Sequence, residues 1–112
     1  MKKRIAIPLE EGKLCEHFGH CRQFAIVDTD DNAITGETLV TAPPHEPGLL
    51  PSWLAAKGVT DVIAGGMGQR AIRLLNNHNI NVFTGAPLKN YSDLIKEFLN
   101  STLETGANYC DH

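Results

Sequence analysis

The second half of the chain alternates short apolar runs with longer segments of helical spacing. Residues 60–64 and 80–84 are apolar runs of strand length, whereas residues 49–57, 69–77 and 90–103 place apolar side chains every three or four positions. An alternation of this kind gives parallel strands joined by right-handed helical crossovers. It restricts the possible folds more than any other feature, because parallel strands are normally covered by helices on both faces of the sheet.

The first half predicts three more strands, at residues 3–8, 23–28 and 34–42. The turn-forming residues 29–32 separate the last two strands, which we expect to form a hairpin. Gly36 within the third run indicates a bulge or a later start of that strand. The expected fold class is therefore α/β, with a mixed sheet of five strands between layers of helices.

Composition narrows the classes of protein. The 112 residues suit one compact domain, 1–112, of which residues 105–112 are expected to form a tail. The net charge is −3 and the one basic run is short, at residues 2–4, so we expect no nucleic-acid partner. The chain lacks an apolar segment long enough for a signal peptide or a membrane span, so we expect a cytoplasmic protein with no membrane partner.

The chain contains three cysteines, Cys15, Cys21 and Cys110. An odd number in a chain large enough to bury a core argues against a disulfide framework. We therefore expect free thiols that are available as thiolate ligands.

A first group of potential metal ligands has the pattern Cys15-x-His17-x-x-His20-Cys21. Four soft or borderline donors within seven residues suit Zn²⁺, copper or the iron of an iron–sulfur cluster. The spacing matches neither a zinc finger nor a ferredoxin. The alternative interpretation is that the cysteines pack in the core and His17 is a hydrogen-bonded loop residue.

A second pair of donors, Cys110 and His112, lies at the end of the chain. Such a tail could fold back to complete a site begun by the first loop. It could equally be a mobile end without a role, because chain termini are usually poorly ordered.

A glycine-rich segment, Gly65-Gly66-Met67-Gly68, joins a predicted strand to a predicted helix. Glycines allow positive φ and close backbone approach, and a helix start presents unpaired N–H groups, so the segment suits an anion. It is neither a Walker loop nor a dinucleotide fingerprint. A tight turn without a ligand, with Met67 packing in the core, is the alternative. His45 lies in a proline-rich loop, where a capped surface loop is the alternative interpretation.

The residues expected of an enzyme are missing. The first strand carries no carboxylate, and the aspartates of residues 28–31 have the usual composition of a hairpin turn. The sequence also has no nucleophile elbow. We therefore expect a protein that does not catalyse a reaction.

Several motifs together resemble the dinitrogenase iron–molybdenum cofactor biosynthesis family, which includes nitrogenase accessory factors and small stand-alone members. The motifs are His17-Phe18-Gly19-His20-Cys21 with Phe24, His45-Glu46-Pro47-Gly48, Gly65-Gly66-Met67-Gly68, Gly85-Ala86 and Cys110-Asp111-His112. The resemblance implies an RNase H-like, three-layer α/β/α fold. Its mixed five-stranded sheet would have the order 3-2-1-4-5, with strand 2 antiparallel.

On that sheet the chain leaves strands 1 and 4 in opposite directions, so ligands would be expected in the gap between them. The resemblance implies a carrier or assembly protein for a metal–sulfur cluster, containing iron and sulfur or molybdenum. The candidate metal ligands are Cys15, His17, Cys21, Cys110 and His112, and the candidate cofactor-binding residues are Gly65, Gly66, Met67, Gly68, His20 and His45. The implied partners are a client apo-protein or a cluster-assembly ATPase. The alternative function is a metal-free regulatory module that docks on such an ATPase.

Overall fold

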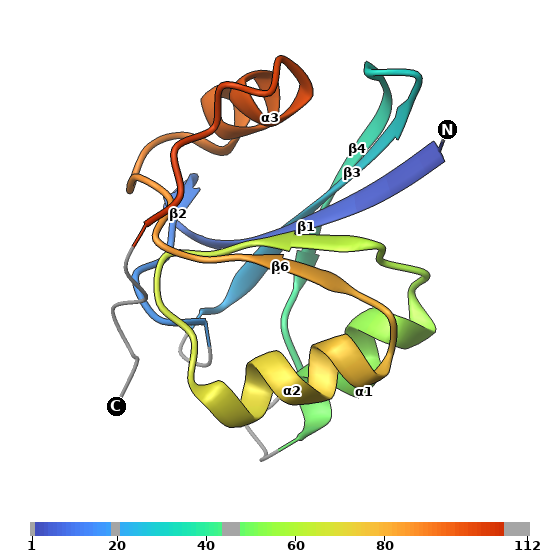
Figure 1. Ribbon diagram of the computed structural model, residues 1–112, viewed down its shortest axis with the longest axis vertical. Helices are drawn as coiled ribbons and strands as arrows, with labels where there is room; N and C mark the ends of the chain where they lie inside the picture. The colour runs from blue at the N-terminus through green and yellow to red at the C-terminus, as the bar shows by residue number, and fades with distance from the viewer. Residues whose placement is uncertain (1, 19–20, 44–47, 107–112) are drawn as a thin grey trace.

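The computed structural model describes residues 2–18, 21–43 and 48–106 (Figure 1). The strands are β1 (Lys2–Glu10), β2 (Lys13–Leu14), β3 (Gln23–Asp30), β4 (Ala33–Thr41), β5 (Asp61–Ile63) and β6 (Asn81–Phe83), and the helices are α1 (Leu49–Ala56), α2 (Gln69–Asn77) and α3 (Tyr91–Leu99). The main sheet has the order β4-β3-β1-β5-β6, and β3 is antiparallel to β1. The predicted order and the predicted antiparallel strand are therefore confirmed. The short strand β2, which pairs with the end of β1, was not predicted.

Helices cover both faces of this sheet (Figure 1). On one face Ile5 of β1 packs in a buried cluster with Leu94 of α3. On the other face Ala6 packs with Leu54 of α1 and Leu75 of α2. Successive residues of a strand point to opposite faces, so β1 contributes to both clusters and lies at the centre of the core. None of the described helices is long and apolar enough to cross a membrane.

The burial expected of the two central strands is confirmed. Ile5 and Ile7 of β1, and Val62 and Ile63 of β5, all have 0% exposed surface. β1 and β5 are parallel neighbours, and Ala6 lies opposite Val62. From β1 the chain continues to β3 on one side of these two strands, and from β5 it continues to β6 on the other side. The gap between β1 and β5 is therefore the topological switch point that the resemblance implied.

β1 continues through Pro8 to Glu10, so its predicted end at residue 8 is wrong. The carbonyl of Pro8 accepts a hydrogen bond from the N–H of Cys15, and the nitrogen of Pro8 faces the same side of the strand as this carbonyl. On that side β5 pairs only with Ile5 and Ala6, and has already ended. The missing N–H of Pro8 therefore removes no hydrogen bond between β1 and β3, and proline is tolerated here.

α3 ends at Leu99, four residues earlier than the apolar spacing predicts. Ser101 has a φ of 58°, a left-handed conformation that turns the chain out of the helix. Leu103 nevertheless packs against the same apolar cluster as Leu94. The apolar spacing therefore identified a residue of the core, but it did not locate the end of the helix. The bulge at Gly36 is confirmed, because the pairing of β3 with β4 shifts between Asp28 and Thr29.

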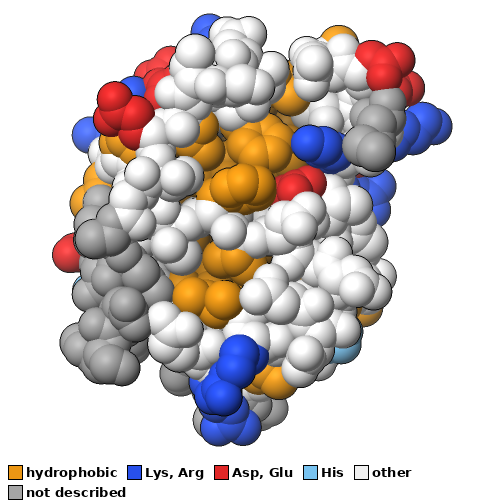
Figure 2. All heavy atoms as spheres, in the orientation of Figure 1, with side chains coloured by type: hydrophobic (Ala, Val, Ile, Leu, Met, Phe, Trp, Pro, Cys, Tyr) orange, Lys and Arg blue, Asp and Glu red, His pale blue; other side chains and the backbone are white. Residues whose placement is uncertain are grey.

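Apolar side chains gather on the face that carries β6, between α3 and α2 (Figure 2). Phe83 of β6 packs edge to face against Phe98 of α3, with ring centroids 5.3 Å apart. Nζ of Lys3 lies 5.2 Å from the centroid of the Phe98 ring. These contacts hold α3 against this face of the sheet.

After α3 the chain returns to the end of β6. The N–H of Gly106 donates a hydrogen bond of 3.2 Å to the carbonyl of Thr84. Gly85 has a φ of 73°, and a Cβ atom at this position would lie 2.5 Å from the backbone N and C of Gly106. The close approach of the two backbones therefore requires a residue without a side chain at position 85.

We expect Gly85→Ala to displace residues 103–106 from the end of β6. Gly12→Ala is a matched control, because Gly12 has a φ of 82° but no atom lies within 4 Å of the place that its Cβ would occupy. The left-handed conformation should cost about 1 kcal/mol in either variant, and the clash should cost about 1–3 kcal/mol more in Gly85→Ala. Denaturant unfolding measures the difference, and hydrogen exchange should show a less protected Gly106 amide. If the two substitutions lower the free energy of unfolding equally, the close approach of Gly85 and Gly106 is wrong.

Candidate metal centre

Two loops that leave the same rim of the sheet are hydrogen-bonded to each other. One follows β1 and β2 and contains Cys15 and Cys21, and the other is the glycine-rich segment after β5. The N–H of Gly66 donates to the carbonyl of Glu16 at 2.7 Å, and the N–H of Phe18 donates to the carbonyl of Gly66 at 2.9 Å. The two loops thus meet beside the switch point between β1 and β5, as the predicted strand order required.

The cysteine loop is also anchored by its side chains. Phe18 is 3% exposed and lies in the core cluster that contains Met67 and Phe24. The rings of Phe18 and Phe24 pack edge to face, with centroids 5.8 Å apart. Met67 has no exposed surface, in agreement with its interpretation as a packing residue, so its side chain is not available to a cofactor.

Cys15 and Cys21 form a disulfide, with their Cα atoms 6.0 Å apart. The expectation of free thiols at these two positions is therefore wrong for this state of the protein. The carbonyl oxygen of His17 lies 3.4 Å from Sγ of Cys15 and 2.9 Å from Sγ of Cys21. Counting cysteines could not reveal this pair, because it results from the path of the loop. Only the reduced pair could ligate a metal.

The imidazole of His17 lies nearer to solvent than the two sulfurs do. Its side chain is 47% exposed and Nε2 is 4.0 Å from Oε1 of Glu16, whereas Cys15 and Cys21 are 5% and 9% exposed. The part of the chain that the structure describes contains no group of three or more His, Cys, Asp or Glu residues placed to hold a metal ion. A complete set of protein ligands would therefore need donors from outside these residues.

Four of the predicted site residues, His20, His45, Cys110 and His112, lie outside the described residues, and their assignment stays a prediction. β4 is antiparallel to β3 and therefore runs parallel to β1, so the loop that contains His45 begins at the same rim as the cysteine loop. At this point the N–H of Ala42 donates to the carbonyl of Arg22 at 2.8 Å.

One N–H group of the glycine-rich segment is not free to bind the anion that the sequence suggested. The N–H of Gly66 is already bonded to Glu16, and the carbonyl of Gly65 accepts the N–H of Gly85 at 2.7 Å. Gly68 is exposed and has a φ of −64° and a ψ of 149°, so the positive φ that glycine would permit is not used there. Nothing lies within 4 Å of a Cβ position at Gly68. Nothing within the described structure therefore requires glycine at position 68.

Two arginines that the sequence analysis did not select lie next to these loops. Arg22 directly follows Cys21 and lines a hollow of about 610 Å³ together with Glu10 and Glu11. Arg70 is exposed in the first turn of α2, which has no acidic residue and no side-chain cap at Gly68. The positive end of the helix dipole and Arg70 both favour an anion at this end of α2. The sequence could have pointed to these two arginines, because they lie next to the cysteine and glycine motifs.

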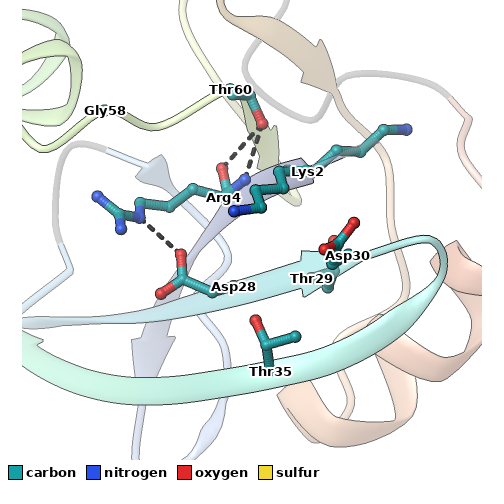
Figure 3. A pocket seen from close by; sticks show the side chains of 9 residues that line it. Lys2, Arg4, Asp28, Thr29, Asp30, Thr35, Gly58 and Thr60 are labelled. Carbon is teal, nitrogen blue, oxygen red and sulfur yellow. Dashed lines mark hydrogen bonds and ion pairs between the residues drawn. The ribbon is translucent and has the colours of Figure 1, made fainter.

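Another hollow, of about 530 Å³, lies at the amino end of β1 (Figure 3). In it Nε of Arg4 lies 2.6 Å from Oδ1 of Asp28, and the backbone N–H of Arg4 donates to Oγ1 of Thr60 at 2.9 Å. The described residues that line it include neither cysteine nor histidine, the donors that a soft metal prefers.

Comparison with known proteins identifies relatives over most of the chain. Residues 1–101 match the family model described as "Dinitrogenase iron-molybdenum cofactor", a match that ends before Cys110. The protein MJ0580 of Methanocaldococcus jannaschii is 29% identical over 106 residues, which cover 90% of this chain and 89% of that protein.

Solved structures share the fold. The crystal structure of PH0822 has a TM-score of 0.86 and 34% identity, with 91% of this chain and 93% of that chain covered. The apo form of the orange protein from Desulfovibrio gigas has a TM-score of 0.78 at 22% identity, with 95% and 94% covered. On the extent of the family match, this chain belongs to the dinitrogenase iron–molybdenum cofactor family.

Proposed function

We propose that this protein is a non-enzymatic carrier or assembly protein for a metal–sulfur cluster that contains iron and sulfur or molybdenum. The observation that carries the proposal is the hydrogen-bonded meeting of the cysteine loop and the glycine-rich loop, through Glu16, Phe18 and Gly66. It holds two sulfur donors beside the start of α2, at the place where ligands bind in open α/β sheets. Membership of a family linked to metal-cluster assembly supports the same function.

The reduced pair Cys15 and Cys21 would supply two thiolates, and the tail could supply the remaining donors. Gly106 lies against Gly85, and the N–H of Gly85 is bonded to the carbonyl of Gly65. The next residue, Gly66, contacts the cysteine loop. Cys110 follows Gly106 by four residues, a span of at most about 14 Å. Because the described chain ends on this side of the molecule, Cys110 and His112 are the proposed additional ligands.

Two arginines and a helix start are the groups at the rim that would hold an anionic cargo. Metal–sulfide clusters with thiolate ligands carry negative charge, which basic groups and a helix N-terminus stabilise. Arg22 and Arg70 stand next to the two loops, and the first turn of α2 carries no carboxylate. A cluster seated there would contact the backbone near Gly68, with His20 and His45 as further contacts.

In this role the protein would receive its cluster from a cluster-assembly ATPase or deliver it to a client apo-protein, in the cytoplasm. The family resemblance also supports our assignment of the sheet to the RNase H-like type. The alternative function, a metal-free docking module, is favoured by one observation: Cys15 and Cys21 are bonded to each other and bind no metal in that form.

The first test is anaerobic reconstitution. Reduced wild-type protein, incubated with Fe²⁺, sulfide and molybdate, should become coloured and retain metal and sulfide in whole-number ratio to protein. Cys21→Ser combined with Cys110→Ser should abolish the uptake, because it removes one thiolate from each contributing segment. His17→Ala should weaken it, whereas His78→Ala, a change of an exposed histidine at the far end of α2, should not.

Two outcomes would contradict parts of this proposal. If the wild-type protein retains neither metal nor sulfide, the carrier function is wrong and the metal-free docking module replaces it. If the double variant still binds the cluster, the carrier function survives, but the ligands are wrong and the cluster is held by backbone N–H and basic groups alone.

The second test concerns the approach of the cluster to Gly68. Gly68→Val should change the free energy of unfolding by less than about 0.5 kcal/mol, because the backbone conformation is allowed and the site is open. It should nevertheless reduce cluster uptake, since the new side chain would occupy the space that the cluster needs. Gly36→Val, in the bulge of β4, is the control. Undiminished uptake by Gly68→Val would show that the segment is only a turn.

A further inference from the structure

We propose that the Cys15–Cys21 disulfide is a reversible redox gate on the metal centre: the dithiol form accepts metal and the disulfide form excludes it. The inference rests on the proposed function and adds its regulation. It starts from the observation that the two cysteines within the described residues are joined to each other. A sulfur in a disulfide carries no negative charge and is a poor ligand, so oxidation removes both donors together.

The loop backbone is suited to both forms. The Cα–Cα separation of 6.0 Å lies within the range for disulfides. Two thiolates on one tetrahedral metal, each about 2.3 Å from it, are about 3.8 Å apart. Rotation of the two side chains about Cα–Cβ can produce this spacing, so Cys15 and Cys21 can change partners without a change of backbone path.

Contacts other than the disulfide hold the loop in place. Phe18 is buried in the core, and Glu16 and Phe18 are hydrogen-bonded to Gly66. At the start of the loop the N–H of Cys15 donates to the carbonyl of Pro8 at 2.9 Å. Reduction should therefore leave the loop folded, with the two thiols adjacent and able to bind a metal.

The chemistry requires an oxidant, for which we name a small-molecule disulfide such as oxidised glutathione. The thiolate of Cys21, the more exposed of the two, attacks one sulfur of this disulfide and releases the other half as a thiol. The thiolate of Cys15 then attacks the Cys21 sulfur and releases the second thiol. One S–S bond forms and one breaks; two electrons pass to the small disulfide, and the protons of Cys15 and Cys21 pass to the leaving thiolates. A dithiol reductant reverses the sequence.

The test uses the full chain with Cys110→Ser, in which Cys15 and Cys21 can pair only with each other. Oxidised glutathione should remove both free thiols without adding glutathione to the intact mass. In Cys15→Ser/Cys110→Ser the glutathione adduct should instead remain on Cys21, because the resolving thiol is missing. Co²⁺ is the metal probe and is used on the wild-type chain, because Cys110 is itself a proposed ligand: the reduced protein should show thiolate-to-cobalt charge-transfer absorption, and the oxidised protein should lose most of it. Circular dichroism should be the same for both forms.

Each result bears on a distinct claim. If both thiols of the Cys110→Ser protein stay free in excess oxidised glutathione, or if the oxidised form binds Co²⁺ as well as the reduced form, the gate is wrong. If wild-type protein reconstitutes a cluster equally well before and after oxidation, the carrier function is supported but the redox gate is wrong. If the disulfide forms and opens but the reduced protein binds neither Co²⁺ nor a cluster, the thiolate ligands and the gate are both overturned.

Discussion

The arrangement of the rim depends on the need to satisfy the backbone polar groups of Gly66. This residue is buried just beyond β5, where the sheet ladder has ended and water is excluded. Buried N–H and C=O groups almost always have partners, because an unpaired group costs about 1–3 kcal/mol. Glu16 and Phe18 supply both partners of Gly66. The cysteine loop is therefore positioned by a requirement of the core, which fixes the place of its sulfur atoms before any metal is involved.

The central part of the fold could be predicted because it follows from the burial of strands on both faces. Residues such as Ile5 and Val62 form unbroken apolar runs, and these runs marked the strands β1 and β5 correctly. The boundaries were less accurate. β1 passes through Pro8 because its neighbour on that side is short, and α3 stops before Ser101 although the apolar spacing continues to Leu103. The first difference comes from the length of a neighbouring strand and the second from a left-handed residue, and the apolar spacing marks neither.

The candidate site could be predicted only as a set of loops. The sequence, with the family resemblance, brought the Cys15–Cys21 loop and the Gly65–Gly68 segment to one rim, and the structure agrees. It did not indicate that Cys15 and Cys21 are bonded to each other, or that the N–H of Gly66 is occupied, because both depend on the exact path of the loop. The contact between Gly85 and Gly106 was also missed, since no pattern in the sequence links two glycines that far apart.

The two ends of the described chain lie at opposite ends of the molecule (Figure 1). Lys2 pairs with Asp30 at the hairpin end of the sheet, whereas Gly106 lies against Gly85 near the rim that holds the cysteines. A partner domain or purification tag fused before residue 1 would therefore extend away from the candidate metal centre. One fused after His112 would be joined through six residues to Gly106, at the end of the molecule that carries the rim. A polyhistidine tag at that end would bring its own imidazoles to the rim, so metal content is best measured on protein tagged at the amino end.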